Sequence, residues 1–85
     1  MTSEQFKKDV WRWAEKIRVE PRQVHIRKMK RKWASCSSKG RLTFDMEVLS
    51  LSKKRRDEII VHELLHLRYP SHNKMFHRLM ERYLG

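Results

Sequence analysis

The sequence predicts an α+β domain in which an N-terminal, a central and a C-terminal helix pack with a small antiparallel sheet. Three segments have apolar residues at helical spacing, and one run between them alternates with the two-residue period of strands. Polar turn residues separate these segments. The 85 residues suffice for one domain, so we expect residues 1–85 to form a single unit.

Residues 3–19 are expected to form the first helix. Its apolar positions recur at steps of four, three and four residues: Phe6, Val10, Trp13 and Ile17. Thr2 or Ser3 can cap the start, because a short hydroxyl side chain accepts hydrogen bonds from free backbone N–H groups. Pro21 prevents the helix from continuing.

Residues 23–37 and the segment after them are expected to form a β-hairpin. Val24 and Ile26 alternate with polar residues, and the basic run 27–32 continues the strand along a solvent-facing edge. The turn falls at residues 37–40, which include Gly40. In the second strand Leu42, Phe44 and Met46 would share one face, with Thr43 and Asp45 on the other.

Two further helices are expected in the last third of the chain. Ser52 is a suitable N-cap for the central helix, which should end near Arg68 because the residue before Pro70 avoids helical angles. Ser71 can cap the C-terminal helix. The apolar stripe of that helix is Phe76, Leu79, Met80 and Tyr83.

The central helix contains the pattern HExxH, as His62-Glu63-Leu64-Leu65-His66. Residues four apart lie on one face of a helix, one turn from each other. Both imidazoles could therefore bind one Zn²⁺, and Glu63 could reach the attacking water as a general base. The competing interpretation is that both are ordinary histidines of a basic protein.

His72 is the expected third metal ligand, because it follows His66 by six residues across a turn that contains Pro70. Glu81 is the alternative third ligand, although an acid among arginines is more commonly solvated. His77 could bind substrate, but an exposed helix histidine is the simpler interpretation.

The net charge of +11 favours polyanionic partners or simply increases solubility. A possible nucleic-acid contact lies in the basic run beside Trp33, whose ring could stack on a base. Its basic members are Arg27, Lys28, Lys30, Arg31 and Lys32.

The single cysteine, Cys36, excludes an internal disulfide and fits a reducing cytoplasm. A small buried thiol is its simplest interpretation, with a metal ligand as the alternative. The chain shows neither a signal peptide nor an apolar stretch long enough to span a membrane, so we expect a cytoplasmic protein without a membrane partner.

Two blocks, WASCSSKGRLTFD and IIVHELLHLRYPSHNKMF, together resemble the small zinc metallopeptidases of the YgjP-like group, relatives of the SprT-like proteases in the gluzincin-type HExxH class. The similarity runs from about Lys32 to Tyr83. It implies a zinc-dependent peptidase in which His62, His66 and His72 bind the metal and Glu63 is the catalytic base. The alternative is a basic nucleic-acid-binding module with a structural or vestigial zinc site.

Overall fold

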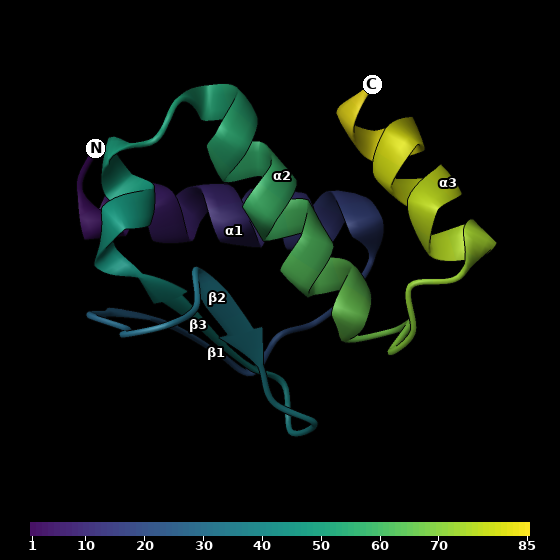
Figure 1. The fold of residues 1–85 in the computed structure, drawn as a ribbon, viewed down its shortest axis with the longest axis horizontal. Coiled ribbons are helices and arrows are strands. Elements are labelled where there is room, and N and C mark those ends of the chain that lie inside the picture. Colours follow the sequence, from purple (N-terminus) through teal and green to yellow (C-terminus); the bar gives the residue numbers. More distant parts are fainter.

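The computed structural model describes residues 1–85 as three α-helices, three strands and one 3-10 helix (Figure 1). In chain order these are α1 Ser3–Ile17, β1 Gln23–Arg27, β2 Ala34–Cys36, β3 Arg41–Asp45, η1 Met46–Ser50, α2 Lys53–His66 and α3 Lys74–Leu84. The predicted α+β class with three helices is confirmed. Figure 1 shows α2 between the sheet and α3, with α1 crossing behind it. None of the helices is long and apolar enough to cross a membrane.

The sheet differs from the predicted antiparallel hairpin. It has three strands in the order β1-β3-β2, with β1 parallel and β2 antiparallel to the central β3. The predicted strand over residues 23–37 is broken into two, because the chain leaves the sheet after Arg27 and returns at Ala34 on the other side of β3. The basic run was therefore wrongly placed in a strand, since only Arg27 belongs to one.

A buried carboxylate explains this break. The Asp45 Oδ1 atom accepts the backbone N–H of Met29 at 2.7 Å, and Asp45 Oδ2 accepts that of Glu47 at 3.0 Å. The first bond ties residues 28–32, here called the basic loop, to the end of β3. The second caps η1. Met46 thus starts a 3-10 helix and is 53% exposed, whereas it was predicted to share the apolar strand face.

The hairpin turn itself is confirmed between β2 and β3. Gly40 donates its backbone N–H to the Ser37 carbonyl at 3.1 Å and has a φ of +88°, in the left-handed region that glycine adopts without strain. Arg22, just before β1, donates its N–H to the Gly40 carbonyl at 2.7 Å. The turn is therefore also tied to the start of the parallel strand.

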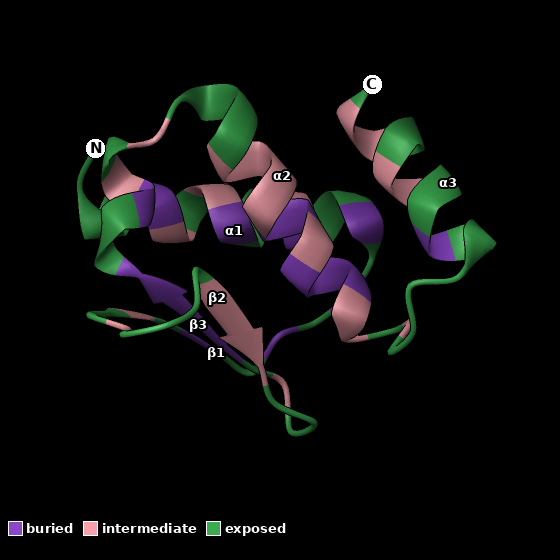
Figure 2. Cartoon of the chain, viewed as in Figure 1, coloured by how far each residue is buried: buried purple, intermediate pink, exposed green.

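The core lies between the sheet, α1 and α2 (Figure 2). Leu42 and Phe44 are fully buried, and the Phe44 ring meets Phe6 of α1 edge-on at 5.0 Å between centroids. Thr2 caps α1 as one of the two expected residues, but the helix ends at Ile17 rather than at residue 19. Trp13 is half-buried, and its indole N–H donates to Asp57 Oδ1 of α2 at 3.1 Å.

Helix α2 is central, as predicted. Ser52 caps it by accepting the Arg55 N–H, and the helix ends at His66, two residues before the predicted position. Its buried apolar residues are Ile60, Val61, Leu64 and Leu65. Asn73 rather than Ser71 caps α3, because its side chain accepts the Phe76 N–H at 3.0 Å.

Candidate metal centre

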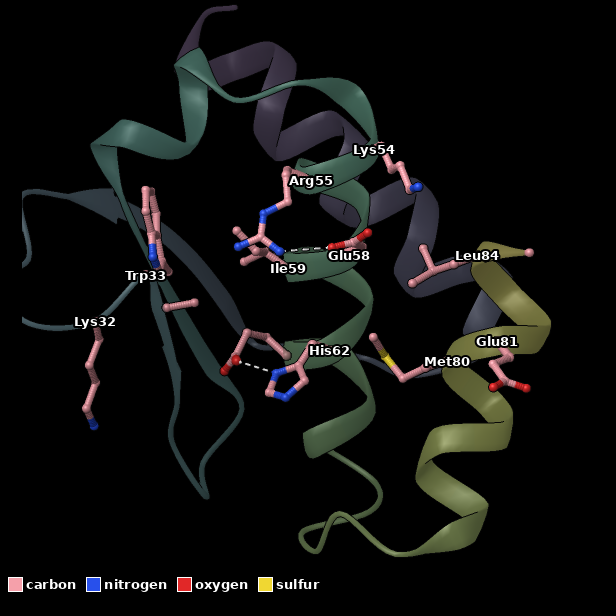
Figure 3. A pocket seen from close by; sticks show the side chains of 13 residues that line it. Lys32, Trp33, Lys54, Arg55, Glu58, Ile59, His62, Met80, Glu81 and Leu84 are labelled. Atoms are coloured by element: carbon pink, nitrogen blue, oxygen red, sulfur yellow. Dashed lines mark hydrogen bonds and ion pairs between the residues drawn. The ribbon is translucent and has the colours of Figure 1, made fainter.

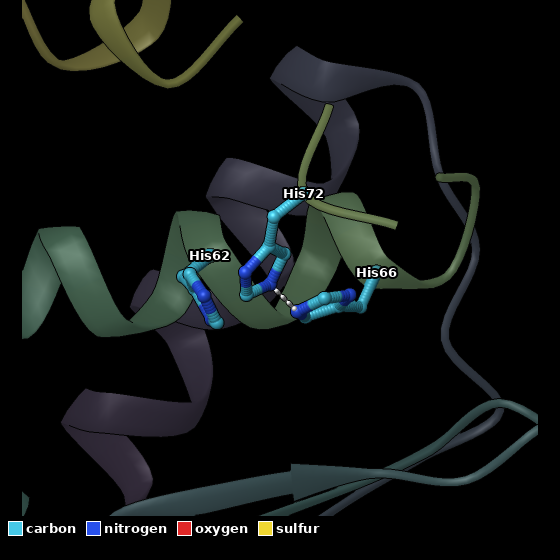
Figure 4. A group of neighbouring side chains, drawn as sticks. All are labelled: His62, His66 and His72. Carbon is cyan, nitrogen blue, oxygen red and sulfur yellow. Dashed lines mark hydrogen bonds between the residues drawn. The ribbon is translucent and has the colours of Figure 1, made fainter. Parts of the chain in front are cut away.

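Three histidines from two separate segments meet at one point beside α2 (Figure 4). His62 and His66 stand one turn apart on the helix, and His72 comes from the loop between α2 and α3. One ring nitrogen of each lies within 4.8 Å of the other two. The Nε2 atoms of His66 and His72 face each other at 2.6 Å. The structure thus brings together all three histidines that the sequence analysis selected as metal ligands.

Phe76 packs against all three imidazoles. This residue, in the first turn of α3, is only 1% exposed, and its ring centroid lies 5.4, 5.0 and 4.7 Å from those of His62, His66 and His72. The sequence analysis assigned Phe76 to an apolar stripe and gave it no place in the site. A possible signal was its position four residues after His72.

Glu63 is the only glutamate among the buried residues, at 9% exposure. Its Oε2 atom lies 3.0 Å from His62 Nδ1. The residue lines both a large groove on the His62 side and a smaller hollow that it shares with Cys36 and His66. Its carboxylate is therefore beside the histidine cluster and accessible to a molecule entering from either hollow.

The local electrostatics favour a neutral imidazole at His66. Burial lowers the pKa of His66, and the neighbouring His62 and His72 lower it further, with Glu63 acting in the opposite direction. A neutral imidazole keeps the lone pair that a metal needs. Burial raises the pKa of the Cys36 thiol, and the Glu63 carboxylate raises it further, so Cys36 remains a thiol at neutral pH.

The alternative candidates lie outside the cluster. Glu81 is exposed on α3 and lines the large groove, and the group of converging donors does not include it. His77 is also exposed, with its ring centroid 6.3 Å from that of His72. Cys36 is half-buried in β2 and lines the smaller hollow.

The large groove has a volume of about 1040 Å³ and runs along α2 away from His62 (Figure 3). Arg55, Ile59 and His62 on successive turns of α2 form its floor. Trp33, just before β2, and Ala34 form one wall, and Met80 and Leu84 of α3 form the other. Sequence analysis did not foresee this groove, because its walls come from segments about 50 residues apart.

Strand β2 is an edge of the sheet on the side of the groove. Asp45 donates its N–H to the Trp33 carbonyl at 2.8 Å, and Ser37 donates to the Arg41 carbonyl at 2.9 Å. Because antiparallel strands alternate inward and outward backbone groups, the N–H and C=O groups of Ala34 and Cys36 point away from β3. They are available to another extended chain.

The residues predicted to contact nucleic acid are all exposed. Arg27 ends β1, and Lys28, Lys30, Arg31 and Lys32 belong to the basic loop. Trp33, which follows directly, is 43% exposed. Lys32 and Trp33 also line the large groove, so the basic loop adjoins the region of the histidines.

Comparison with solved structures shows that the fold of this chain is similar to that of a metallopeptidase. Its fold is similar to the crystal structure of the metallopeptidase zymogen of Pyrococcus abyssi abylysin, with a TM-score of 0.79 and 28% identity over 91% of this chain and 77% of that one. The fold is that of a metallopeptidase domain, and the three converging histidines could hold a metal ion. A comparison with curated proteins gave no match.

The family follows from the sequence itself. Residues 1–85 match the YgjP-like metallopeptidase domain over their whole length, and the chain belongs to this family. Membership confirms the resemblance that the two sequence blocks indicated. It implies a metal cofactor and peptide substrates.

Proposed function

We propose that this protein is a zinc-dependent peptidase of the HExxH class, with His62, His66 and His72 as the zinc ligands and Glu63 as the general base. The observation that carries the proposal is the convergence of three imidazoles beside a buried carboxylate at the end of a groove. Three nitrogen donors suit a catalytic zinc site, whereas structural zinc sites are closed by four ligands and are commonly rich in cysteine. The partial exposure of the cluster is consistent with an open fourth position.

A bound Zn²⁺ would supply a Lewis acid that polarises the substrate carbonyl and makes a water molecule more acidic. Glu63 then accepts a proton from that water molecule while the water oxygen bonds to the carbonyl carbon of the substrate. When the C–N bond breaks, Glu63 transfers the proton to the leaving amine. The Glu63 carboxylate is restored, and the products are a carboxylic acid and an amine. Phe76 holds the three imidazoles in place from the protein side.

The free edge of β2 would hold the substrate. An extended peptide laid along this edge can bond to the outward backbone groups of Ala34 and Cys36, in the manner of an added strand. The side chains of these two residues are on the same face as their partners Phe44 and Leu42, which is the face toward the helices. Such a peptide would pass between β2 and α2, next to Glu63.

The roles can be separated by measuring metal content and hydrolysis in the same variants. Glu63→Gln keeps the size of the side chain but removes the base, so we expect it to retain one zinc per chain and lose about 10²–10⁴-fold in rate. His72→Ala should lose zinc affinity, whereas the matched variant His77→Ala should keep it. Loss of metal from Glu63→Gln, or full zinc affinity in His72→Ala, would contradict the assignment.

One observation favours a second function, which is the exposed Trp33 next to the five exposed basic residues. A basic loop with an adjacent aromatic ring is suited to single-stranded nucleic acid, which stacks bases on such rings. If it binds, affinity should fall steeply with salt, and changing Lys28, Lys30 and Lys32 to Glu should weaken binding to all sequences alike. Absence of binding at low salt would exclude this function.

A further inference from the structure

A hollow of about 510 Å³ at the C-terminal end of α2 is lined by four basic side chains. They come from the end of α1, the segment before β1, the turn between β2 and β3, and the end of α2: Arg18, Arg22, Lys39 and Arg68. We call this hollow the arginine pocket. Folding thus brings together like charges from sequence positions up to about 50 residues apart.

Positive charge predominates in the arginine pocket. None of its four basic side chains forms an ion pair, and Glu20 is the only acid that lines it. Like charges held together repel one another, which is unfavourable unless an anion binds between them. Arg18 and Arg68 lie at the C-terminal ends of helices, where the helix dipole also favours a cation. Arg22 and Lys39 lie at no helix end, so the dipoles do not account for the whole cluster.

The basic residues are positioned through their backbone, and their charged groups remain free. Arg22 donates its backbone N–H to the Gly40 carbonyl at 2.7 Å, and a Cβ added at Gly40 would lie 3.3 Å from Arg22 Cγ. Arg68 donates its backbone N–H to the Leu65 carbonyl at 3.1 Å. Each guanidinium can therefore use its planar set of N–H donors to bind an oxyanion with two parallel hydrogen bonds.

The arginine pocket adjoins the proposed catalytic centre. Ser38 lines both this pocket and the smaller hollow that Glu63 shares with His66. Arg68 follows His66 by only two residues. A molecule that occupies the smaller hollow can therefore extend into the arginine pocket.

The direction of β2 determines which part of a substrate reaches the pocket. β2 runs from Ala34 to Cys36 and continues into the turn at residues 37–40. Antiparallel pairing is slightly more stable per residue than parallel pairing. An antiparallel peptide passes the turn first, then Cys36 and then Ala34, so its residues before the cleaved bond lie toward Lys39.

We propose that the arginine pocket binds acidic side chains of the peptide substrate, on residues that precede the cleaved bond. This inference rests on the proposed function for the position of that bond. The occupant is a segment that carries Asp or Glu, because the pocket continues the hollow beside the catalytic glutamate and a carboxylate matches the guanidinium groups. All four basic side chains are exposed, so each ion pair contributes a factor of about 1.5–5 and weakens with salt.

Peptides of one sequence test the proposal, with two Glu, two Gln or two Lys residues shortly before the cleaved bond. We expect kcat/KM of the zinc-loaded enzyme at low salt to be about 2–25-fold higher for the Glu than for the Gln peptide, the combined effect of two exposed ion pairs, and lowest for Lys. A second series carries the same pairs after the bond, which mass spectrometry of the products locates. Equal rates for Glu and Gln in the first series, or an advantage of Glu confined to the second, would overturn the proposal.

Variants connect the preference to the pocket. The double variant Arg18→Gln and Arg68→Gln should lose most of the advantage of the Glu peptide. Arg78→Gln with Arg82→Gln is the matched control, since both residues are exposed on α3, lie outside the pocket and give the same change in net charge. Lys39→Glu, at an exposed turn position, should shift the preference toward the Lys peptide. An unchanged preference in Lys39→Glu would contradict the proposal, even if the first double variant fails to fold.

Binding separates this proposal from the proposed chemistry. The dissociation constants of the same peptides for zinc-loaded Glu63→Gln should follow the same order, with the Glu peptide tightest. If that order is found, and is lost when Lys39→Glu is added, while the wild-type enzyme cleaves none of the peptides, the pocket assignment stands and the catalytic proposal fails. If peptides are cleaved but their charge affects neither binding nor rate, the pocket assignment fails and the catalytic proposal stands.

A single-stranded oligonucleotide is the competing occupant, and its binding is measured on the same variants. If Arg18→Gln with Arg68→Gln weakens oligonucleotide binding but leaves the response to acidic peptides unchanged, the proposal is overturned and the arginine pocket belongs to a nucleic-acid surface. If the response to acidic peptides is lost and oligonucleotide binding is kept, the proposal is supported.

Discussion

The histidine cluster and the basic loop both border the large groove, through His62 and Lys32, but they are held in place in different ways. His62 and His66 project from a helix whose opposite side is fully buried, and Phe76 packs against their rings from α3. The basic loop, in contrast, has no element of its own and is tied to the sheet through the bond from Met29 to Asp45. Apolar packing fixes the position of the histidine cluster, whereas the carboxylate of Asp45 fixes the position of the basic loop.

This difference matters for function, because metal binding requires ligands fixed to within a fraction of an ångström and an anion-binding surface does not. Packing of side chains in a dense core holds positions well, because small changes in volume are costly there. A single carboxylate, Asp45, ties residues 28–32 to the sheet, and the side chains of the four basic residues in this loop are exposed. We therefore expect substitutions in the two regions to affect different measurements.

Among the substitutions that test this difference, Phe76→Ala should have the largest effect on stability and zinc affinity. It removes a fully buried ring, which costs about 3–5 kcal/mol of unfolding free energy, and leaves the imidazoles without their support. Phe6→Ala is the matched control, since Phe6 is equally buried but packs on Phe44 away from the cluster. Both variants should lose stability in chemical denaturation, but only Phe76→Ala should also lose zinc affinity under conditions where it is folded. Equal zinc affinity in the two variants would show that Phe76 does not position the ligands.

The next largest effect is expected from a substitution at the free edge of β2, and it should appear in peptide cleavage. Ala34→Pro removes an outward N–H that the sheet does not use, so we expect a melting temperature near that of the wild type and a loss of about tenfold in kcat/KM for peptides, the value of one hydrogen bond. Ser35→Pro is the matched control, because alternation places the Ser35 N–H toward β3. It should instead destabilise the fold. A stable Ala34→Pro with full activity would exclude main-chain binding at this position.

The parts of the molecule that the sequence predicted are those governed by local periodicity. The helical spacing of Phe6, Val10 and Ile17 and the turn at Gly40 need no information from distant residues, and both are confirmed. The convergence of His62, His66 and His72 was also foreseeable, because helix geometry fixes the first two and a short loop limits the position of the third.

The parts that were not predicted depend on contacts between distant residues. The parallel pairing of β1 with β3 requires the chain to leave the sheet at the basic loop, and the cause is Asp45, 16 positions after Met29. An aspartate at the end of a strand gives no sequence signal that it will bind a loop. The same holds for the groove, whose floor at Ile59 and wall at Met80 meet only after α3 packs on α2.

The stability of the protein at acid pH tests the role of Asp45, whose carboxylate accepts the backbone N–H groups of Met29 and Glu47. The N–H groups of Met29 and then Glu47 lower the pKa of Asp45. A carboxyl whose pKa is lower in the folded than in the unfolded state stabilises the fold at pH values above its unfolded pKa, about 3.9, and this contribution is lost as pH falls through the folded pKa. Asp45→Asn cannot titrate and can accept only one of the two bonds. The difference in unfolding free energy between wild type and Asp45→Asn should therefore be largest at neutral pH and shrink as pH falls below about 4. If the difference in unfolding free energy does not change with pH, Asp45 stabilises the fold through packing rather than through its charge.

The smallest effects on stability are expected in the basic loop. Lys28 and Lys30 are exposed and form no ion pair, so changing both to Gln should alter the unfolding free energy by no more than about 0.5 kcal/mol each, as is usual for surface sites. Zinc content and kcat/KM for an uncharged peptide should also be unchanged, because neither residue lines the large groove. Lys32→Gln provides the comparison, since Lys32 lines both the groove and the hollow beside His66. It should change kcat/KM for peptides that carry an acidic residue. If the Lys28 and Lys30 variant lost zinc or activity toward the uncharged peptide, the basic loop would belong to the catalytic site, and the two regions would not be independent.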